Sequence, residues 1–361
     1  MKYKSLILIF FIFKINAEEI DFKSMQSLLQ NKINTYNKIK KDEIWNYFPK
    51  NLTLRLGEQN KFILDLKIHL IASGEYKKYN YSFLFDQDLS KSISQYQENN
   101  NLKITGNLNN ETINKLNEPI NNIINSLSQN LNRIKKYNFN GNYILINIPF
   151  FKMSIVYNSN SIYEMQVIVG KPKTQSCVLD SKISSIVLNP SWYIPSSIAK
   201  NEMFSKIVNN PKYFEKHNIK IIKDEKQMEI EDVSFEDYSS LNFVQSPGYN
   251  NALGKVKFVF SNDCGIYLHD TNQPNLFHKN FKGLSHGCIR LSNPEILSKY
   301  LLQYNNFNDE EINKLILLEQ TKTINLKNPM DIHIIYINNY VNTNNEIIYR
   351  DDIYQKNKLT N

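Results

Sequence analysis

Two neighbouring stretches decide how this chain is interpreted: Tyr267-Leu268-His269-Asp270-Thr271 and, after a short loop, Leu284-Ser285-His286-Gly287-Cys288-Ile289-Arg290-Leu291. Together they place one cysteine, two histidines and one tight glycine between apolar, strand-like segments. Cysteine is a strong nucleophile only as a thiolate, so a catalytic cysteine needs a nearby base or positive charge. His269 and His286 are the two candidates for that base. The pattern predicts nucleophilic cysteine chemistry.

The spacing suggests how these side chains meet. A strand that carries His269 and a loop that returns Cys288 beside it would allow a thiolate–imidazolium couple, which supplies a nucleophile and later a proton. Gly287 permits a positive φ, and the N–H groups around Gly287 and Cys288 could face a developing oxyanion. Arg290 has two open interpretations, binding a substrate carboxylate or fixing the loop. His286 could be the base or could hold the turn through backbone hydrogen bonds.

A zinc site is the alternative for the same segment. Cys288, His286, His269 and His278 are all possible ligands, but the segment has one cysteine and lacks a Cys-x-x-Cys or His-x-x-x-His pair. We therefore expect no metal here.

The N-terminus predicts export. Lys2 and Lys4 precede an apolar run over 6–13, and Ala17 is a small residue suited to cleavage. The alternative, an uncleaved anchor, is disfavoured because the run is much shorter than the roughly 20 residues that span a bilayer. We expect a signal peptide over 1–17, no integral membrane span after its removal, and a mature protein outside the cytoplasm.

Composition sets wider limits. The chain has 361 residues with 41% hydrophobic content, enough for about two domains. Its formal net charge of +8 falls to +5 when the three lysines of 1–17 are removed. This surplus could favour an anionic partner such as a cell-wall polymer, or could reflect a biased genome. No basic stripe with interleaved aromatics is present, so we expect no nucleic-acid partner.

The chain has three cysteines, and an odd count leaves at least one thiol unpaired in an exported protein. Cys177 and Cys264 could pair, although their spacing does not establish that they meet. Cys288 is then the natural free thiol, which suits a nucleophile.

The first half of the chain is expected to be mostly helical. From Leu54 to Leu70 apolar residues recur at helical spacing. Further helices are expected after Asp86 and Asn109, which are good N-caps, and after Pro119. The predicted parts are an N-terminal helical scaffold over 18–84, a small helical module over 85–118 and a linking helix over 119–140.

From residue 141 the pattern changes to period two, which predicts strands. Residues 196–250 break this alternation and form an insertion in the β-rich domain. A helix is expected at the start of the insertion, from Ile198, Met203, Phe204 and Ile207, and a polar run follows it. The insertion is either a lid or a disordered excursion. Helices are expected after Ser292 and Asn308. We assign 141–325 to the β-rich domain and 326–361 to a C-terminal strand and tail, in which His333 is structural.

At His269 and Ser285–Cys288 the sequence resembles the L,D-transpeptidase family, whose signature is His, a spacer and Ser/Thr-His-Gly-Cys. The match is His269, fifteen intervening residues and Ser285-His286-Gly287-Cys288. Many members have Asn at the position of Arg290, but Arg is usual in the larger periplasmic branch. Other blocks that resemble this branch are Tyr143–Pro149, Val167–Pro172, Asn189–Pro195, Tyr267–Thr271, Ile334–Tyr336 and Tyr349–Asp352.

The segment from Phe85 to Leu116 resembles the peptidoglycan-binding module that accompanies this branch. The similarity rests on Phe85-Asp86 before a helix and Tyr96-Gln97 near its end. Thr105-Gly106 stands where the family usually has Asp-Gly, and the second glycine is missing, which leaves a generic helical spacer as the alternative.

The resemblance implies an α+β fold: a mixed β-sandwich catalytic domain with an inserted lid subdomain and a mostly helical N-terminal half. Cys288 would attack a stem tetrapeptide, release D-alanine and pass the acyl group to a neighbouring stem amine, forming a 3-3 cross-link. His269 would be base and then acid, with His286 and Gly287 at the turn and oxyanion region. The implied substrate-binding residues are Tyr267, Ser285, Arg290 and Trp192.

The resemblance also implies peptidoglycan stem peptides and glycan as partners, no cofactor, a monomer, and a cell-wall-associated location in the periplasm. Three alternatives stay open. Water could resolve the thioester, giving an L,D-carboxypeptidase, or a protein amine could do so and attach that protein to the wall. The third is a non-catalytic wall-binding protein with a vestigial site.

Overall fold

The computed structural model describes residues 21–78, 80–200, 212–229 and 241–357. The expected signal peptide over 1–17 lies outside the described residues. The described chain divides into two compact units, one over Gly141–Ile335 and one that combines residues 21–140 with 336–357. None of the helices in these ranges is both long and apolar enough to span a bilayer.

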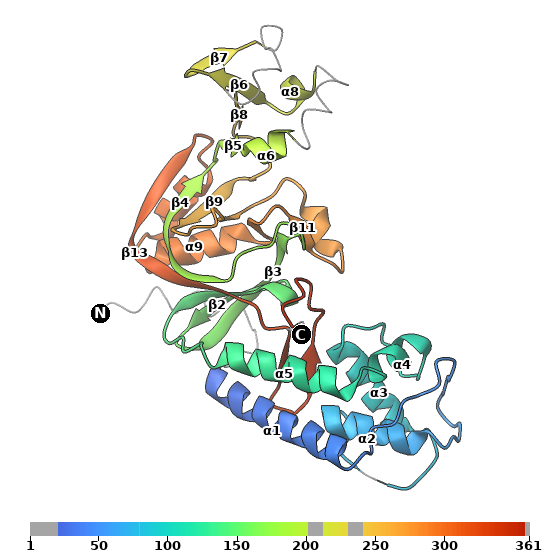
Figure 1. Ribbon diagram of the computed structural model, residues 1–361. Helices are drawn as coiled ribbons and strands as arrows, with labels where there is room; N and C mark the ends of the chain where they lie inside the picture. The colour runs from blue at the N-terminus through green and yellow to red at the C-terminus, as the bar shows by residue number, and fades with distance from the viewer. Residues whose placement is uncertain (1–20, 79, 201–211, 230–240, 358–361) are drawn as a thin grey trace. The chain divides into compact units, whose positions relative to one another are not determined.

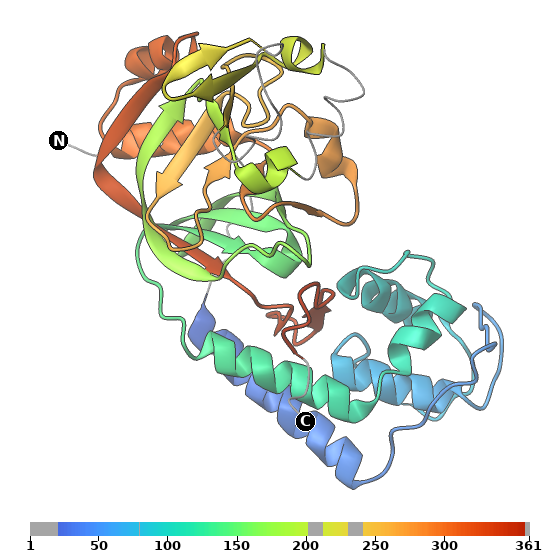
Figure 2. The ribbon, with the colours of Figure 1, turned by 45° about the horizontal axis from the view of Figure 1, so that its top comes forward.

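The Gly141–Ile335 unit is built on one large mixed sheet (Figures 1 and 2). Its strands follow the order β11-β3-β12-β10-β9-β4-β13-β1-β2, and β2 also pairs with β3, so the sheet closes on itself. Parallel pairs (β1 with β13, β10 with β12) occur among antiparallel ones, which confirms the predicted mixed sheet. The strands are β1 (Tyr143–Asn147), β2 (Lys152–Tyr157), β3 (Asn160–Gly170), β4 (Leu179–Leu188), β9 (Val256–Phe260), β10 (Leu268–His269), β11 (Gly283–Ser285), β12 (Ile289–Leu291) and β13 (Lys322–Ile335).

Strand β13 is longer than the sequence suggested. It runs antiparallel to β4 and parallel to β1, in the middle of the sheet. The boundary expected between 325 and 326 falls inside this strand, because alternating Ile324, Leu326 and Met330 are buried together with the later Ile332 and Ile334. As expected, His333 is part of this strand, where its Nδ1 lies 2.7 Å from Asp180 Oδ1.

The insertion contains the start of the expected helix, α6, and also a small sheet that the sequence did not predict. Its strands, in the order β5-β8-β6-β7, carry alternating apolar residues whose inward members share one core. The sheet starts at Trp192, earlier than the expected 196, because β5 pairs with β8. Met203, Phe204 and Ile207 lie outside the described residues. The elements are β5 (Trp192–Ile194), α6 (Ser196–Ile198), α8 (Tyr213–Lys216), β6 (Ile219–Lys223), β7 (Lys226–Met228) and β8 (Asn242–Gln245).

Two helices follow β12 where the sequence predicts them: α9 (Pro294–Tyr304) and α10 (Asp309–Ile316). Pro294 occupies the first position of α9, where its missing N–H costs nothing. Asn308 caps α10 through a capping box with Glu311.

The second unit is mostly helical, as predicted. Asp86 and Asn109 cap their helices by accepting from the N–H groups of Leu89 and Thr112. Helices α1 and α5 lie side by side in Figures 1 and 2. The helices are α1 (Phe22–Lys41), α2 (Ile63–Ser73), α3 (Gln87–Asn99), α4 (Asn110–Leu116) and α5 (Ile120–Ile134).

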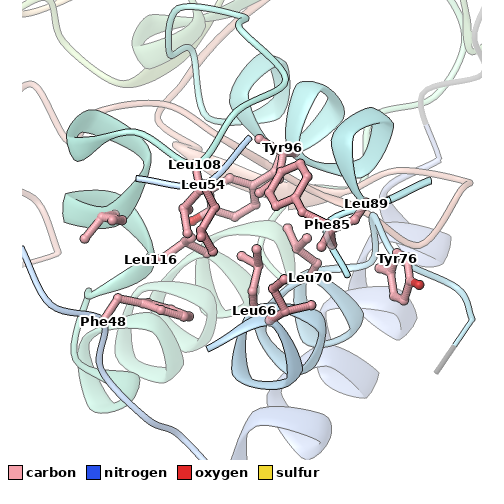
Figure 3. Close-up of a cluster of buried hydrophobic side chains, with 13 residues drawn as sticks. Phe48, Leu54, Leu66, Leu70, Tyr76, Phe85, Leu89, Tyr96, Leu108 and Leu116 are labelled. Carbon is pink, nitrogen blue, oxygen red and sulfur yellow. The ribbon is translucent and has the colours of Figure 1, made fainter. Parts of the chain in front are cut away.

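One apolar core joins both sides of the boundary expected at 84/85 (Figure 3). Leu66 and Leu70 of α2 pack in the same cluster as Phe85 and Leu89. The helical pattern proposed for Leu54 to Leu70 is therefore only partly right. Helix α2 begins at Ile63, whereas the backbone of Leu54 pairs with that of Leu108 in an isolated bridge.

The C-terminal segment returns to the helical unit, where β14 (Asn339–Val341) and β15 (Ile347–Tyr349) form a hairpin. Asn338 is fully buried and exchanges two hydrogen bonds with Asn130 of α5. The Arg350 guanidinium donates to the Asn99 carbonyl at 3.0 Å. Because buried polar groups must be paired, these bonds fix the tail against α3 and α5.

Glu75 is a buried carboxyl in this unit, and burial raises its pKa to about 7. It accepts hydrogen bonds from Ser73 and Asn99, while burial lowers the pKa of nearby Lys32 to about 8. A carboxyl with a raised folded-state pKa contributes stability that is lost as pH rises through that pKa. The protein should therefore lose stability between about pH 5 and pH 8.

We expect Glu75→Gln to remove this loss, because the amide keeps the shape and needs no proton. At pH 8 the free energy of unfolding should rise by on the order of 2 kcal/mol, with little change at pH 5. Urea titrations at both pH values measure this. Glu98→Gln, at an exposed site on α3, is the control. An equal effect of Glu75→Gln at both pH values would contradict the role given to its charge.

Candidate active site

Strand register gathers the candidate residues on one face of the sheet. β10 and β12 are parallel, with Leu268 opposite Ile289 and His269 opposite Arg290. The Ile289 N–H donates to the Tyr267 carbonyl, so the chains continue side by side where Tyr267 meets Cys288. Side chains alternate between faces, so Leu268 and Ile289 enter the core. The polar residues on either side of them share the opposite face.

Lys257 of β9 joins this face, because it lies opposite His269 in the antiparallel β9–β10 pair. Its Nζ lies 3.9 Å from the centroid of the Tyr267 ring. Burial lowers the pKa of Lys257, and the nearby Cys288 opposes that effect. The sequence showed that Lys257 alternates with apolar residues, but only the pairing of β9 with β10 brings it to the site.

The Cys288 thiol is half-buried and hydrogen-bonded to Tyr267. Burial raises the pKa of this thiol, whereas hydrogen bonds from the Tyr267 backbone N–H and hydroxyl oppose the rise. The charges of Lys257 and Arg290 act in the same direction as these bonds. The Tyr267 hydroxyl also contacts the side chain of Trp192 on β5. The structure thus brings Trp192, Tyr267 and Cys288 together.

His269 is buried and neutral. Burial lowers its pKa to about 3, helped by the nearby charges of Arg290 and Lys257. Its Nδ1 lies 2.5 Å from the Asp270 carbonyl oxygen, which can only accept. The proton therefore sits on Nδ1, and Nε2 keeps a lone pair that can take a proton. Burial thus favours the neutral forms of both the His269 imidazole and the Cys288 thiol over the thiolate–imidazolium couple that such a pair can form.

His269 and Cys288 are diagonal neighbours on adjacent strands, because Cys288 stands two residues before the partner of His269. Strands about 4.8 Å apart with a rise of about 3.3 Å per residue put Cα atoms two positions out of register roughly 8 Å apart, within reach of an imidazole side chain. The register therefore places the His269 and Cys288 side chains on one face of neighbouring strands.

The Ser285–Gly287 turn is held by its own hydrogen bonds. Ser285 Oγ accepts from the Gly287 N–H at 3.1 Å and donates to the Cys288 carbonyl at 2.5 Å. Gly287 has φ of 120°, which a residue with a Cβ rarely adopts. The Gly287 N–H is thus engaged inside the turn and does not face an oxyanion. Ser285 is buried and shapes the turn, which argues against the expected substrate contact.

The loop after β3 supports the turn from outside. The Thr174 hydroxyl and the Lys171 N–H both donate to the Ser285 carbonyl, at 3.1 and 3.0 Å. The Ser176 hydroxyl donates to the Gly287 carbonyl at 2.6 Å. Sequence reasoning missed these residues because nothing in their pattern indicates which turn they contact.

The remaining candidate residues lie in different environments. His286 is exposed on the turn, while Arg290 is half-buried and acts electrostatically on His269 and Cys288. Cys177 and Cys264 form a disulfide, which answers the question that their spacing left open. Within the described ranges no three Cys, His, Asp or Glu side chains converge to hold a metal ion.

One of the two hydrogen bonds to the Cys288 thiol comes from the Tyr267 hydroxyl. We therefore expect Tyr267→Phe to raise the Cys288 pKa further. Loss of one such bond to a thiolate should slow alkylation of Cys288 by iodoacetamide at pH 7 by roughly tenfold. The measurement is the alkylation rate as a function of pH. Tyr193→Phe, which removes an exposed hydroxyl next to Trp192, is the control. An unchanged pH dependence in Tyr267→Phe would show that the hydroxyl does not influence the thiol.

Comparison with known proteins identifies the class. A model described as "L,D-transpeptidase catalytic domain" matches residues 141–302, and a model described as "Putative peptidoglycan binding domain" matches 59–116. The chain therefore contains a catalytic domain of the L,D-transpeptidase type and a peptidoglycan-binding domain. This confirms the resemblance found at the His269 and Cys288 motifs.

One similar protein, from Haemophilus influenzae (strain ATCC 51907 / DSM 11121 / KW20 / Rd), is named "Putative L,D-transpeptidase". It is 28% identical over 238 residues, which are 64% of this chain and 48% of that protein. The chain thus spans about half the length of this relative. A "Probable CtpA-like serine protease" of Staphylococcus aureus (strain N315) is 41% identical over 73 residues, covering 20% of this chain and 14% of the protease.

Among solved structures, an L,D-transpeptidase from Mycobacterium smegmatis aligns with a TM-score of 0.27 at 12% identity, covering 54% of this chain and 59% of the other. One from Xylanimonas cellulosilytica aligns with a TM-score of 0.26 at 10% identity, covering 80% and 98%. Scores this low carry no argument about the site.

Proposed function

We propose that this protein is a peptidoglycan L,D-transpeptidase that forms 3-3 cross-links with Cys288 as its nucleophile. The observation that carries the proposal is the shared face on which Tyr267, His269 and Cys288 meet, with a lone pair on His269 Nε2. A neutral thiol beside a neutral imidazole can pass its proton as it attacks, so no thiolate need exist at rest.

The chemistry then runs in two halves. Cys288 Sγ attacks the carbonyl of the third residue of a tetrapeptide stem while His269 Nε2 takes the thiol proton. The imidazolium returns that proton to the departing D-alanine amine, which leaves a thioester on Cys288. In the second half His269 takes a proton from the acceptor amine, which attacks the thioester. The new amide bond forms as Sγ leaves and recovers the proton.

The charges on this face fit such a substrate. Lys257 and Arg290 are positive, and His269 is neutral, so the face attracts anions. Stem peptides carry carboxylates, and an arginine fork binds a carboxylate with two hydrogen bonds. Of the two open interpretations of Arg290, we therefore propose substrate binding, with Trp192 and Tyr267 completing the wall.

The helical unit supports the same proposal. Its match to a peptidoglycan-binding domain provides a means of holding glycan near the catalytic unit. Export through the N-terminal signal would place both units in the periplasm, where this polymer lies. The protein would act there in cell wall biogenesis and cell shape, as a monomer and without a cofactor.

Incubation of the full chain with disaccharide-tetrapeptide, followed by mass spectrometry of the products, tests the proposal. A cross-linked dimer that has lost one D-alanine is expected. Tripeptide alone would assign the protein as an L,D-carboxypeptidase. Absence of any product, with binding to intact cell-wall sacculi retained, would leave the wall-binding alternative.

A further inference from the structure

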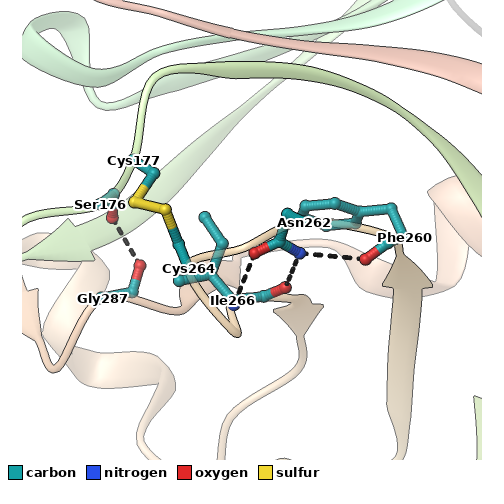
Figure 4. Close-up of a disulfide and its surroundings, with 7 residues drawn as sticks. All are labelled: Ser176, Cys177, Phe260, Asn262, Cys264, Ile266 and Gly287. Carbon is teal, nitrogen blue, oxygen red and sulfur yellow. Dashed lines mark hydrogen bonds between the residues drawn. A yellow bond between two sulfur atoms is a disulfide. The ribbon is translucent and has the colours of Figure 1, made fainter.

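The Ser285–Gly287 turn is enclosed by two loops that are distant in sequence. A Cβ added to Gly287 would lie 3.6 Å from the Gln175 carbonyl on one side and 3.6 Å from Ile266 Cγ2 on the other. The turn before Cys288 therefore has one neighbour in the loop after β3 and another in the loop before β10. Both loops are drawn in Figure 4.

Each loop also bonds directly to the turn or to the thiol. Ser176 links the first loop to the turn, since its hydroxyl donates to the Gly287 carbonyl and accepts from the Gly170 N–H at 2.9 Å. The second loop supplies the Tyr267 N–H to the Cys288 thiol. These contacts leave the nucleophile positioned by two segments that belong to different strands.

The second loop has little regular structure of its own. Between β9 and β10, Asn262 braces it by donating to the carbonyls of Phe260 and Ile266 and by accepting from the Ile266 N–H (Figure 4). Gly265 has a positive φ and makes no close contact that a Cβ would disturb. Asn262 fixes the internal shape of the loop, but its bonds do not reach the loop after β3.

The Cys177–Cys264 disulfide makes that connection (Figure 4). Cys177 directly follows Ser176, and Cys264 stands three residues before Tyr267. The bond closes a loop of 87 residues, so reducing it would release two segments that are otherwise far apart along the chain. Its placement therefore couples the two supports of the catalytic turn.

We propose that the Cys177–Cys264 disulfide, acting through Ser176, is a positioning element that holds the Cys288 turn in its reactive geometry. The inference rests on the proposed role of Cys288 as nucleophile. It predicts that a dithiol which exchanges with this disulfide, leaving two protein thiols and its own disulfide, slows catalysis. Cys264 is exposed and Cys177 half-buried, so such a reagent has access.

The test compares the wild type with Cys177→Ser/Cys264→Ser and with Ser176→Ala, which keeps the disulfide. Both variants should lower kcat for the tetrapeptide by roughly 10- to 100-fold with little change in KM, because misplacing a nucleophile by about 1 Å has such an effect. In the triple variant, Ser176→Ala should add little, since both changes loosen the same turn. Full additivity would overturn the proposed coupling through Ser176.

Amide hydrogen exchange provides a readout that needs no substrate. The peptide containing 285–288 should exchange about tenfold faster in the Cys177→Ser/Cys264→Ser variant, while peptides from β4 and β13 stay protected. Ser181→Ala is the matched control, because its hydroxyl donates to the Ser261 carbonyl and joins β4 to the loop between β9 and β10, away from the turn. Unchanged exchange at 285–288, or equal loss of protection throughout the sheet, would overturn the inference even if the enzyme proved inactive on peptidoglycan.

Discussion

Replacing Cys288 by alanine is expected to abolish cross-linking and D-alanine release together, with a fall in kcat of at least about 10⁴-fold. Another cysteine cannot replace it, because the disulfide occupies Cys177 and Cys264 and leaves Cys288 as the free thiol of the described chain. Product analysis with disaccharide-tetrapeptide measures both activities in one reaction.

The fold should survive this change. The thiol is half-buried and small, so its loss should cost about 1 kcal/mol and shift the Tm by only a few degrees. Binding of the variant to cell-wall sacculi should also persist, because the peptidoglycan-binding domain is a separate match over 59–116. Cross-linking by a well-folded Cys288→Ala protein would refute the assignment of the nucleophile.

Replacing His269 by asparagine is expected to lower kcat by 10²- to 10⁴-fold, the usual contribution of a general base. Asparagine retains a polar group near the Asp270 carbonyl but cannot take the thiol proton. Steady-state kinetics with the tetrapeptide measure the loss. His278→Asn is the matched control, since His278 is exposed on the loop between His269 and Cys288. A normal rate in His269→Asn would transfer the role of base to His286.

The pH profile of the wild type bears on the same residue. Since burial lowers the His269 pKa to about 3, this base stays neutral above about pH 4. The profile of kcat/KM should therefore show no acid limb near the ordinary histidine pKa of about 6.5. A limb near 6.5 that disappears in His269→Asn would show that the imidazole is protonated in the range where we infer a neutral pair.

Where the local sequence pattern is strong, it predicted the helices and strands correctly. Asp86 and Asn109 cap helices because a side-chain acceptor is needed at those positions, and this need is visible in the sequence alone. The small sheet between Trp192 and Gln245 was missed because its strands are three to five residues long, too short for alternation to stand out. The position of β13 in the middle of the sheet depends on pairing with β1 and β4, which no local pattern specifies.

The candidate site also has residues that the sequence predicted and residues that only the strand pairing reveals. Residue type and spacing were enough to propose His269 and Cys288, because their chemistry requires a nucleophile near a base, and the strand register places them on one face. Lys257 could not, since a lysine alternating with apolar residues is usually an outward-facing residue on a strand. The lowered pKa of His269 could not be predicted either, because it depends on burial and neighbouring charge in the folded chain. Residue identity alone showed only that a thiolate–imidazolium couple was possible.

The central claim is that Cys288 carries the acyl group, and trapping that intermediate tests it most directly. The enzyme would be mixed with disaccharide-tetrapeptide, quenched in acid after a short interval, digested and examined by mass spectrometry. We expect the peptide containing Cys288 to gain the mass of the disaccharide-tripeptide acyl group, with one D-alanine released for each acylated enzyme. Turnover with the acyl group on another residue, or with no acylated enzyme and an unmodified Cys288 throughout, would contradict the account.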